Sequence, residues 1–298
     1  MNQKKVVLAL LIKGRNLILL WMIRLVGIAW LALLAPKIVC GMDEKSRQEL
    51  IQKAEKGDAW AQNDLAAYYN EGSNGFPKDQ TKGMELYRKS AEQGFPKGML
   101  NLGILYKRGD NVPQDYNEAM KWFLKVVEAP EDRFPDKKAA QRDLGWAENN
   151  IGSLYRRGLG VDKNPEEAIK WYRKSAARNS RVAEKNLGIC YQEGFGVEKD
   201  DIEAVNWFTK AAQKGEPRAQ IYLAECYEQG LGVEKNPETA FSWMKKSADQ
   251  KHAQGQVALA NYYAKGIGTK QDLVLAVDLY QKGSAKLMEI LQEINPRD

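Results

Sequence analysis

The sequence contains few of the residues that reactive centres and disulfide scaffolds require. Its 298 residues include only one histidine and three cysteines. Zinc sites and cysteine–histidine hydrolases use several of these side chains together, and small secreted disulfide scaffolds are dense in cysteine. We therefore expect no cofactor, no metal site and no disulfide framework.

Excess positive charge is missing from most of the chain, although the formal net charge is +6. The six basic residues behind this excess all precede Cys40, and no acidic residue accompanies them; they are Lys4, Lys5, Lys13, Arg15, Arg24 and Lys37. The rest of the chain carries 39 basic and 39 acidic residues. Because nucleic-acid binding depends on a basic surface, we expect no nucleic-acid partner.

The amino-terminal segment has the composition of an export signal. Nineteen residues from Leu17 to Ala35 are apolar except for Arg24, and a basic stretch precedes them. A basic start followed by an apolar run is typical of secretory signals. We expect residues 1–41 to be a signal peptide or a signal anchor, with cleavage after Gly41 favoured.

Three alternatives remain open for this segment. An uncleaved anchor would nearly span a bilayer and would leave the rest of the chain outside the cytoplasm. Lipidation of Cys40 is less favoured, because Lys37, Ile38 and Val39 stand where a lipoprotein signal has small residues. A start at Met22 would also leave a complete export signal. The expected location is periplasmic or secreted, or else anchored in the inner membrane with the body outside the cytoplasm.

Self-comparison divides the remaining chain into six similar units. Their first halves contain a short motif, LGICYQEG in the copy that starts at Leu187, and the six copies start at residues 65, 102, 151, 187, 223 and 259. The last four copies are 36 residues apart. A repeat of this length is typical of a solenoid built from helix pairs.

Both halves of each unit have the apolar spacing of a helix. In the first half a small residue, a Leu or Ile and a Tyr recur every four residues, and in the second half an Ala precedes a Trp by three residues. We expect these aromatic residues to form the structural core of the repeats: Trp122, Trp171, Trp207, Trp243, Tyr106, Tyr155, Tyr191 and Tyr227.

The expected helix ends agree with this pattern. Each first half ends at a glycine, and glycine enters the left-handed conformation of a helix terminus without steric penalty; these are Gly72, Gly109, Gly158, Gly194, Gly230 and Gly266. Each second half starts at an Asp or Asn that can accept hydrogen bonds from first-turn amides; these are Asp79, Asp115, Asn164, Asp200, Asn236 and Asp272. A lysine recurs near the other end of the second helix, where it complements the helix dipole.

These motifs resemble the Sel1-like repeat, a relative of the tetratricopeptide repeat. The resemblance is carried by the LGxxYxxGxGV stretch, as in Leu187–Val197, and by the capped EAxxWF stretch, as in Glu203–Phe208. It implies an all-α fold, a right-handed α/α solenoid of six helix-turn-helix repeats, that binds or scaffolds other proteins, often at or beyond a membrane. It also implies that enzymatic activity is uncommon.

We expect caps at both ends of the solenoid, because terminal units must shield their apolar faces. The expected division is an N-terminal capping helix over residues 42–58, six repeats over 59–284 and a C-terminal capping extension over 285–298. The stripe Leu287, Ile290, Leu291 and Ile294 on this extension either packs back on unit six or meets a partner.

An insertion near residues 129–142 separates the second and third units, whose spacing is 49 instead of 36 residues. It is either a tolerated surface insertion or a docking element. Its second part is predicted to lengthen the first helix of unit three from Asp136 and to display five side chains: Phe134, Lys137, Lys138, Arg142 and Trp146.

Cys190 and Cys226 occupy the same core position in neighbouring units. Packed helices lie 8 to 10 Å apart, whereas a disulfide needs Cα atoms within about 7 Å, so we expect two buried free thiols. Members of the resembled family that are rich in cysteine link their units by disulfides, and this sequence lacks that pattern. His252 stands alone in a linker and is interpreted as a surface residue.

The concave side of the solenoid is the expected binding groove, by analogy with tetratricopeptide repeats. First-helix positions just before the Leu column and two after it form the candidate partner-binding groove: Asn101, Asn150, Ser153, Asn186, Tyr222, Glu225 and Asn261. An amide both donates and accepts, which suits a peptide main chain. The alternative is that Asn101, Asn150 and Asn186 only pair with neighbouring backbone.

The leading hypothesis is a non-enzymatic, exported protein-interaction scaffold that binds a peptide or partner protein. The alternative is a β-lactamase-like or peptidoglycan-directed hydrolase of the cysteine-rich repeat type. Only the S-x-x-K spacing of Ser242 and Lys245 favours it, and neither S-D-N nor K-T-G follows. A third hypothesis, RNA binding, lacks the basic groove it would need.

Overall fold

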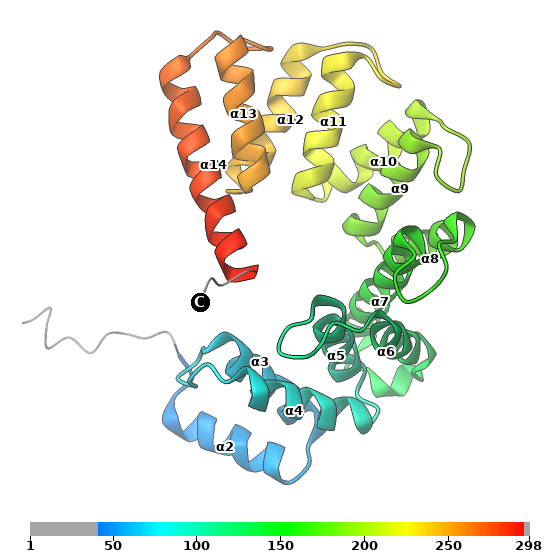
Figure 1. The fold of residues 1–298 in the computed structure, drawn as a ribbon, viewed down its shortest axis with the longest axis vertical. Helices are drawn as coiled ribbons and strands as arrows, with labels where there is room; N and C mark the ends of the chain where they lie inside the picture. Colours follow the sequence, from blue (N-terminus) through cyan, green and yellow to red (C-terminus); the bar gives the residue numbers. More distant parts are fainter. Residues whose placement is uncertain (1–40, 295–298) are drawn as a thin grey trace, which may run out of the picture.

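The structure is a computed structural model that describes residues 41–294, with side chains to residue 285. Within this range the regular elements are all helical, so the all-α solenoid of six helix pairs is confirmed (Figure 1). The predicted signal segment and the side chains of the C-terminal stripe lie outside the described part.

Each unit consists of two antiparallel helices. Units 1 to 3 comprise α3 (Ala59–Glu71) with α4 (Gln80–Glu92), α5 (Pro96–Arg108) with α6 (Tyr116–Glu128), and α7 (Lys137–Arg157) with α8 (Pro165–Ala177). Units 4 to 6 comprise α9 (Arg181–Glu193) with α10 (Asp201–Gln213), α11 (Pro217–Gln229) with α12 (Pro237–Asp249), and α13 (Ala253–Lys265) with α14 (Leu273–Ile294). A leading helix, α2 (Glu44–Glu55), packs on α3 through Leu50 and Ala54.

The helices begin and end where the capping pattern predicts. All six first helices end at the expected glycines, which have left-handed backbones, as at Gly194 with a φ of 68°. The second helices start after Asp or Asn side chains that accept first-turn amides, as where Asp200 Oδ1 accepts the Glu203 amide at 2.9 Å. These residues terminate the helices locally and so fix the length of each unit.

Glycines also let the two helices of a unit approach closely. A Cβ atom at Gly188 would lie 2.5 Å from the Phe208 ring, and one at Gly152 would lie 2.8 Å from the Tyr172 ring. The most buried aromatic position of the second helix is therefore the one directly after the tryptophan column. Phe123, Tyr172 and Phe208 occupy it and are almost inaccessible to solvent.

The tryptophans predicted to form the core are less deeply placed than expected. Trp122 is buried, whereas Trp171, Trp207 and Trp243 are partly exposed and pack against the edge of the core clusters. In units 2, 3 and 4 the residue directly after the tryptophan lies at the centre of the core, because it packs against the glycine of the first helix. In all four units with a tryptophan, the lysine three residues after it places its Nζ over the indole, 3.8 to 4.1 Å from the ring centroid.

The four core tyrosines predicted for the first helices also lie at the edge of the core: Tyr106, Tyr155, Tyr191 and Tyr227 are all partly exposed. Two of them bind the preceding unit through their hydroxyl groups. Arg88 donates to the Tyr106 hydroxyl and Arg173 donates to the Tyr191 hydroxyl, each at 2.9 Å.

Loop glycines join successive units. A Cβ atom at Gly196 would lie 2.5 Å from the Pro165 carbonyl oxygen, and one at Gly232 would lie 2.0 Å from the Asp201 carbonyl oxygen. Each loop therefore rests on the start of the second helix of the preceding unit. A side chain at either glycine would displace the loop from this position, so glycine permits the close packing of one unit on the next.

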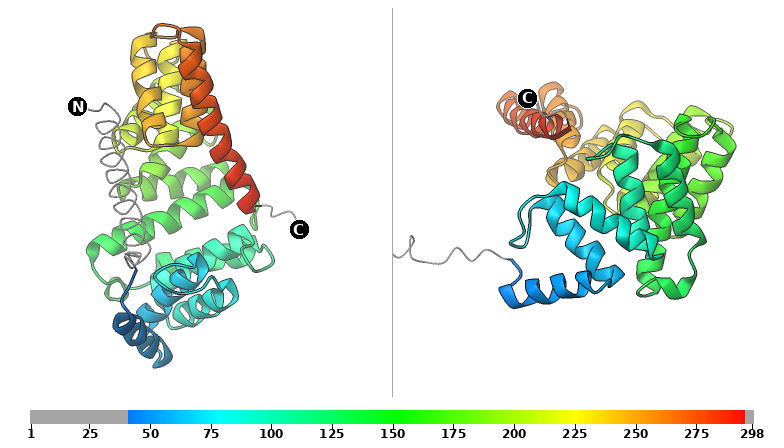
Figure 2. Two further views of the ribbon diagram at one scale, coloured as in Figure 1. Left: turned by 90° about the vertical axis from the view of Figure 1, so that its left-hand side faces the viewer. Right: turned by 60° about the horizontal axis from the view of Figure 1, so that its bottom comes forward.

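The helix pairs follow an arc that brings the carboxyl end of α14 back toward the first unit (Figures 1 and 2). First helices of neighbouring units touch each other, as α3 with α5, α5 with α7 and α11 with α13, while successive second helices make fewer such contacts. The first helices therefore line the inner side. Among the helices of residues 41–294, none combines the length and the hydropathy that a membrane span requires.

The insertion between units 2 and 3 forms a short 3-10 turn, Glu131–Arg133, and two additional turns at the start of α7. Asp136 caps the lengthened helix, where its side chain accepts the Ala139 amide at 2.7 Å. The expectation that Phe134 is displayed is wrong. Phe134 is 6% exposed and packs in the core cluster that includes Val126 of α6 and Ala140 of α7.

Cys190 and Cys226 are buried and unpaired, as predicted. Burial raises the pKa of each thiol to about 11. His252 is the N-cap of α13, and its Nδ1 accepts the Gly255 amide at 3.2 Å. The histidine therefore has a local capping role that its position in a linker did not reveal.

Candidate protein-interaction surface

The inner side of each first helix presents a stripe of four positions. In α5 these are Lys97, Asn101, Ile104 and Arg108, spaced by four, three and four residues, so that they share one helical face. The opposite face buries Leu102 and Gly103 against α6. We call these four positions in the first helices the inner stripe. Its two middle positions are those that the sequence predicted, and its two outer positions were missed.

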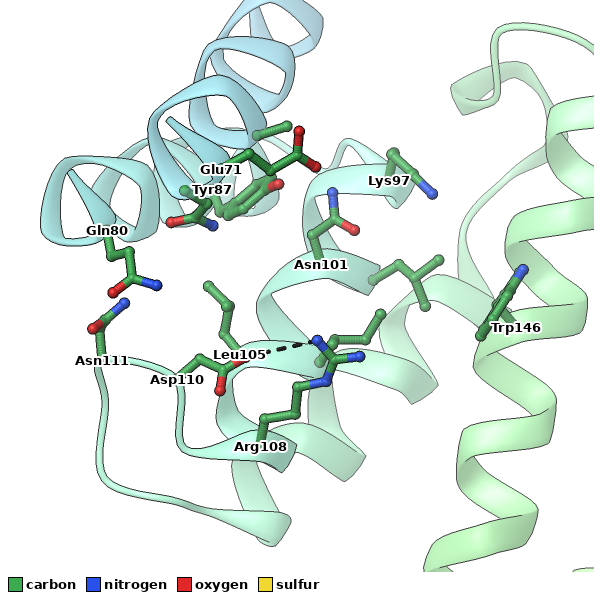
Figure 3. A pocket seen from close by; sticks show the side chains of 14 residues that line it. Glu71, Gln80, Tyr87, Lys97, Asn101, Leu105, Arg108, Asp110, Asn111 and Trp146 are labelled. Atoms are coloured by element: carbon green, nitrogen blue, oxygen red, sulfur yellow. Dashed lines mark ion pairs between the residues drawn. The ribbon is translucent and has the colours of Figure 1, made fainter. Parts of the chain in front are cut away.

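A hollow of about 500 Å³ opens on the inner stripe of units 1 to 3. Figure 3 shows its polar side chains, with Asn101 and Lys97 from α5 between Tyr87 of unit 1 and Trp146 of unit 3. Arg108 and Asp110 form an ion pair of 3.8 Å at its rim. The hollow thus combines hydrogen-bonding groups with aromatic walls, which is the usual composition of a site for part of another molecule.

Two tryptophans are exposed at the first position of the inner stripe. Trp60 of unit 1 is 52% exposed and Trp146 of unit 3 is 48% exposed. The equivalent residue of unit 2 is Lys97, whose Nζ lies 3.4 Å from the buried Asp143 carboxylate. Large exposed aromatic side chains are uncommon on surfaces without a partner and are enriched in protein interfaces.

The three asparagines predicted for the groove bind neighbouring helices. Asn101 donates to Asn63 Oδ1 at 2.9 Å, and Asn186 donates to Asn149 Oδ1 at 2.8 Å. Both contacts join the first helices of successive units.

Asn150 is also engaged, because it donates to the Trp146 carbonyl at 2.9 Å and accepts from Lys107 Nζ at 2.6 Å. Asn150 and Asn186 are buried, whereas Asn101 lines the hollow of units 1 to 3. The structure therefore brings these amides together as links between first helices. Their contact with a ligand stays a prediction.

The other predicted groove residues lie apart from the first hollow. Tyr222 and Glu225 line a second hollow of about 340 Å³ between α11 and α13, together with Arg218. The Tyr222 ring stacks on Phe208 with centroids 5.1 Å apart. Burial, and then repulsion by Glu228, raise the pKa of Glu225.

Ser153 is partly exposed on α7, and Asn261 is exposed on α13, where it accepts the Tyr280 hydroxyl. The predicted set of groove residues therefore does not form one continuous site. Of this set, Asn101 lines the hollow of units 1 to 3, and Tyr222 and Glu225 line the hollow between α11 and α13.

The residues behind the hydrolase alternative do not form a site. Ser242 and Lys245 are both exposed on α12, and neither lines the hollows of the inner stripe, of α11 and α13, or of the start of α7. No hydrogen bond in that part of the chain joins the hydroxyl to a base, which an activated serine requires. No cluster of metal-binding side chains occurs among the residues that the structure describes.

The sequence matches the Sel1 repeat model six times, at residues 61–95, 96–128, 138–180, 182–216, 217–252 and 253–286. A solved Sel1 repeat protein from Oxalobacter formigenes is 29% identical, with a TM-score of 0.69 over 80% of this chain and 90% of that one. A protective antigen present in uropathogenic Escherichia coli strains, displaying an SLR fold, is 35% identical, with a TM-score of 0.62 over 80% of this chain and 48% of that chain.

A curated relative from Arabidopsis thaliana is the ERAD-associated E3 ubiquitin-protein ligase component HRD3A. It is 33% identical over 69 residues, which are 23% of this chain and 10% of the plant protein. An immunity protein from Pseudomonas aeruginosa, 22% identical with a TM-score of 0.52, shares the fold. The chain therefore spans about half of the Escherichia coli protein and a small part of the plant protein.

Proposed function

The chain belongs to the Sel1 repeat family, and from this premise we propose that it is a scaffold that binds an extended segment of another protein along its inner stripe. Sel1 repeats are generally non-catalytic units of protein interaction. The observation that carries the proposal is the pair of exposed tryptophans at the first position of the inner stripe, Trp60 and Trp146, of which Trp146 lines the hollow of units 1 to 3.

The chemistry of this surface favours a peptide segment. Tryptophan offers a large apolar surface at a low cost in side-chain entropy, and interface hot spots are enriched in it. Asn101 and Lys97 supply donors near the same hollow. A segment lying across α3, α5 and α7 would bury apolar side chains on the tryptophans and direct polar groups toward α5. A single site of this kind is expected to support moderate affinity, because area alone does not set affinity.

The test is capture of a partner by the tagged full chain in the cells that produce it. We expect one protein to be retained by the wild type and lost with the double variant Trp60→Ala/Trp146→Ala. Both side chains are half exposed, so their removal leaves the helices folded, which circular dichroism verifies. Lys245→Glu on the outer helix α12 is the matched control. If every captured protein is retained equally by the double variant, binding along the inner stripe is refuted.

We further propose that the repeats act outside the cytoplasm. The support is the apolar run Leu17–Ala35 with its basic flank, and the balanced charge of the chain after Cys40. Amino-terminal sequencing of the protein from fractionated cells tests cleavage. A mature terminus after Gly41 in the periplasmic or extracellular fraction supports cleavage, whereas a cytoplasmic protein that retains Met1 or Met22 excludes export.

A further inference from the structure

A third hollow, of about 370 Å³, lies between the start of α7 and the turn from α8 to α9. Four basic residues line it and no acidic residue does; they are Lys138, Arg142, Arg178 and Arg181. The exposed Trp146 ring forms part of its wall, and the same residue lines the hollow of units 1 to 3. We call this third hollow the basic pocket.

The insertion creates the basic pocket. The helix α7 has 21 residues, whereas the first helices of the other five units have 13 each. One face of its additional turns is held in the core by Ala140 and Leu144, next to Phe134. The other face presents Lys138, Gln141 and Arg142 to the pocket. The insertion is thus amphipathic. A surface insertion without a function would not require such a division into an apolar and a basic face.

Buried carboxylates hold two of the arginines in place. The Asp143 side chain is 1% exposed and accepts from Arg142 Nε at 2.9 Å and from Nη2 at 3.3 Å. The Glu148 side chain is 2% exposed, and both of its oxygens accept from Arg178 Nε at 3.0 Å. A guanidinium has five N–H donors, so further donors of both arginines have no partner among the described residues.

The turn between α8 and α9 completes the basic pocket. Asn179 has a left-handed backbone with a φ of 67°, and Ser180 is the N-cap of the 13-residue helix α9. The first amides of a helix are unpaired and favour negative charge. Arg181, which follows the cap, also lines the pocket, and its Nη1 donates to the Lys214 and Gly215 carbonyls at 3.2 Å.

We propose that the basic pocket binds an acidic segment of a partner protein in which a large apolar side chain adjoins two or more carboxylates. Arginine donors match carboxylates in a bidentate geometry, and the Trp146 ring accepts the apolar side chain. This inference rests on the proposed scaffold function and names the chemistry of a second docking site beside the inner stripe.

The extent of the basic cluster favours a peptide over a nucleic acid. The chain after Cys40 has equal numbers of acidic and basic residues, and the four cations are gathered around one hollow. Nucleic acids are bound by basic surfaces that follow several phosphates. A volume of about 370 Å³ holds a few side chains.

Binding is tested with the fluorescein-labelled full chain in mild detergent and two libraries of bead-bound hexapeptides. One library carries Glu at the second and fourth positions with the others randomised, and the second carries Gln at those positions. We expect the acidic library to retain the chain about tenfold more at low salt, and this preference to fall as salt is raised. Peptides selected from the acidic library should be rich in Leu, Phe or Trp beside the fixed acids.

Variants then locate the site. Lys138 and Trp146 are exposed, and no ion pair in the described part uses Lys138. We expect Lys138→Glu and Trp146→Gln each to weaken binding of a selected peptide about tenfold. The first variant loses a charge-assisted hydrogen bond and the second loses an aromatic contact. Lys245→Glu makes the same charge change on α12 and should bind as the wild type does.

Equal retention by both libraries overturns the inference, and so does unchanged binding by Lys138→Glu. Stronger retention by single-stranded oligothymidylate or by phosphatidylglycerol vesicles, lost in Lys138→Glu, also overturns it and assigns the pocket to another anion. The variant Trp60→Ala separates the two proposals, because Trp60 does not line the basic pocket. Selection of acidic peptides without capture of a cellular protein would reject the scaffold function alone.

Discussion

In unit 5 the ammonium nitrogen of Lys246 lies 3.8 Å from the centroid of the Trp243 ring. The same pairing occurs in units 2, 3 and 4, between Lys125 and Trp122, Lys174 and Trp171, and Lys210 and Trp207. The lysine stands in the last turn of its helix, so it also complements the helix dipole. In units 3, 4 and 5 the repeated lysine therefore covers an indole that the core leaves partly exposed.

We expect neighbouring aromatic positions of α10 to differ in their effect on stability. Phe208→Ala removes a fully buried ring and should lower the free energy of unfolding by about 3–5 kcal/mol. Trp207→Ala should cost less because its ring is partly exposed, and Lys210→Met should cost about 0.5–1 kcal/mol from the lost cation–π contact. Urea denaturation followed by circular dichroism measures all three. A larger loss at Trp207 than at Phe208 would contradict the assignment of the core.

Two helical glycines are expected to respond oppositely to alanine. At Gly188 the new methyl group would lie 2.5 Å from the buried Phe208 ring, so Gly188→Ala should destabilise the fold by about 1–3 kcal/mol. At Gly145 the new methyl group would lie 3.6 Å from the nearest atom, which is an ordinary contact. Gly145→Ala should therefore stabilise the fold by about 0.5–1 kcal/mol through the lower entropy of the unfolded chain. Thermal melts compare the two variants directly. Equal melting temperatures would show that the helices of unit 4 do not approach as closely as described.

The Glu225 carboxyl should make stability depend on pH. Burial and the nearby Glu228 raise its pKa above the ordinary value of 4.5, so the folded chain binds this proton more tightly than the unfolded chain does. Its contribution is fully present below pH 4.5 and is lost as pH rises through the raised value. The stability of the wild type relative to Glu225→Gln should therefore be greater near pH 4.5 than at pH 7.

Urea titrations at several pH values measure this difference, since other groups titrate in both proteins and cancel. Glu198→Gln, which changes an exposed carboxyl in the loop after α9, is the matched control. Parallel stability profiles for the wild type and Glu225→Gln would show that this carboxyl is not desolvated in the fold.

The thiols of Cys190 and Cys226 should be inert in the folded protein. Burial raises the pKa of each to about 11, so little thiolate exists at pH 8. We expect iodoacetamide to leave both peptides unmodified without denaturant and to label both in guanidinium without reductant, as read by peptide mass. A failure to label in guanidinium would indicate a disulfide, and rapid labelling of the folded chain would indicate exposed thiols.

Helix ends could be predicted from the sequence because they depend on single residues. The left-handed glycine at residue 194 and the cap at Asp200 each act within one turn, so their chemistry is visible without the fold. The core was predicted with a shift of one position. Periodicity places Trp207 and Phe208 on the same side of a helix. The close approach of Gly188 to Phe208 decides which of the two rings lies at the centre of the core.

The candidate sites depend on residues that the sequence keeps apart. Lys138 and Arg181 line one pocket although 43 positions separate them in the chain. The exposure of Trp146 was predicted, whereas the burial of Phe134 was not, because Phe134 lies in an irregular turn and its burial becomes visible only through its packing with the core of units 2 and 3. Trp60 could have been found from its place five residues before the Leu column.

The loop glycines make the units interchangeable in principle. Gly232 rests on Asp201 and Gly268 rests on Pro237, so the parts that touch are separated by the same stretch of chain each time. Removing residues 201–236 would take out Gly232 together with the site it occupies and would leave Asp200 to cap α12, with the seat of Gly268 intact. Shortening the array by this whole unit therefore preserves the remaining junctions. The insertion between units 2 and 3 also leaves its junction in place, since Gly160 still lies against the backbone of Tyr116 at the start of α6.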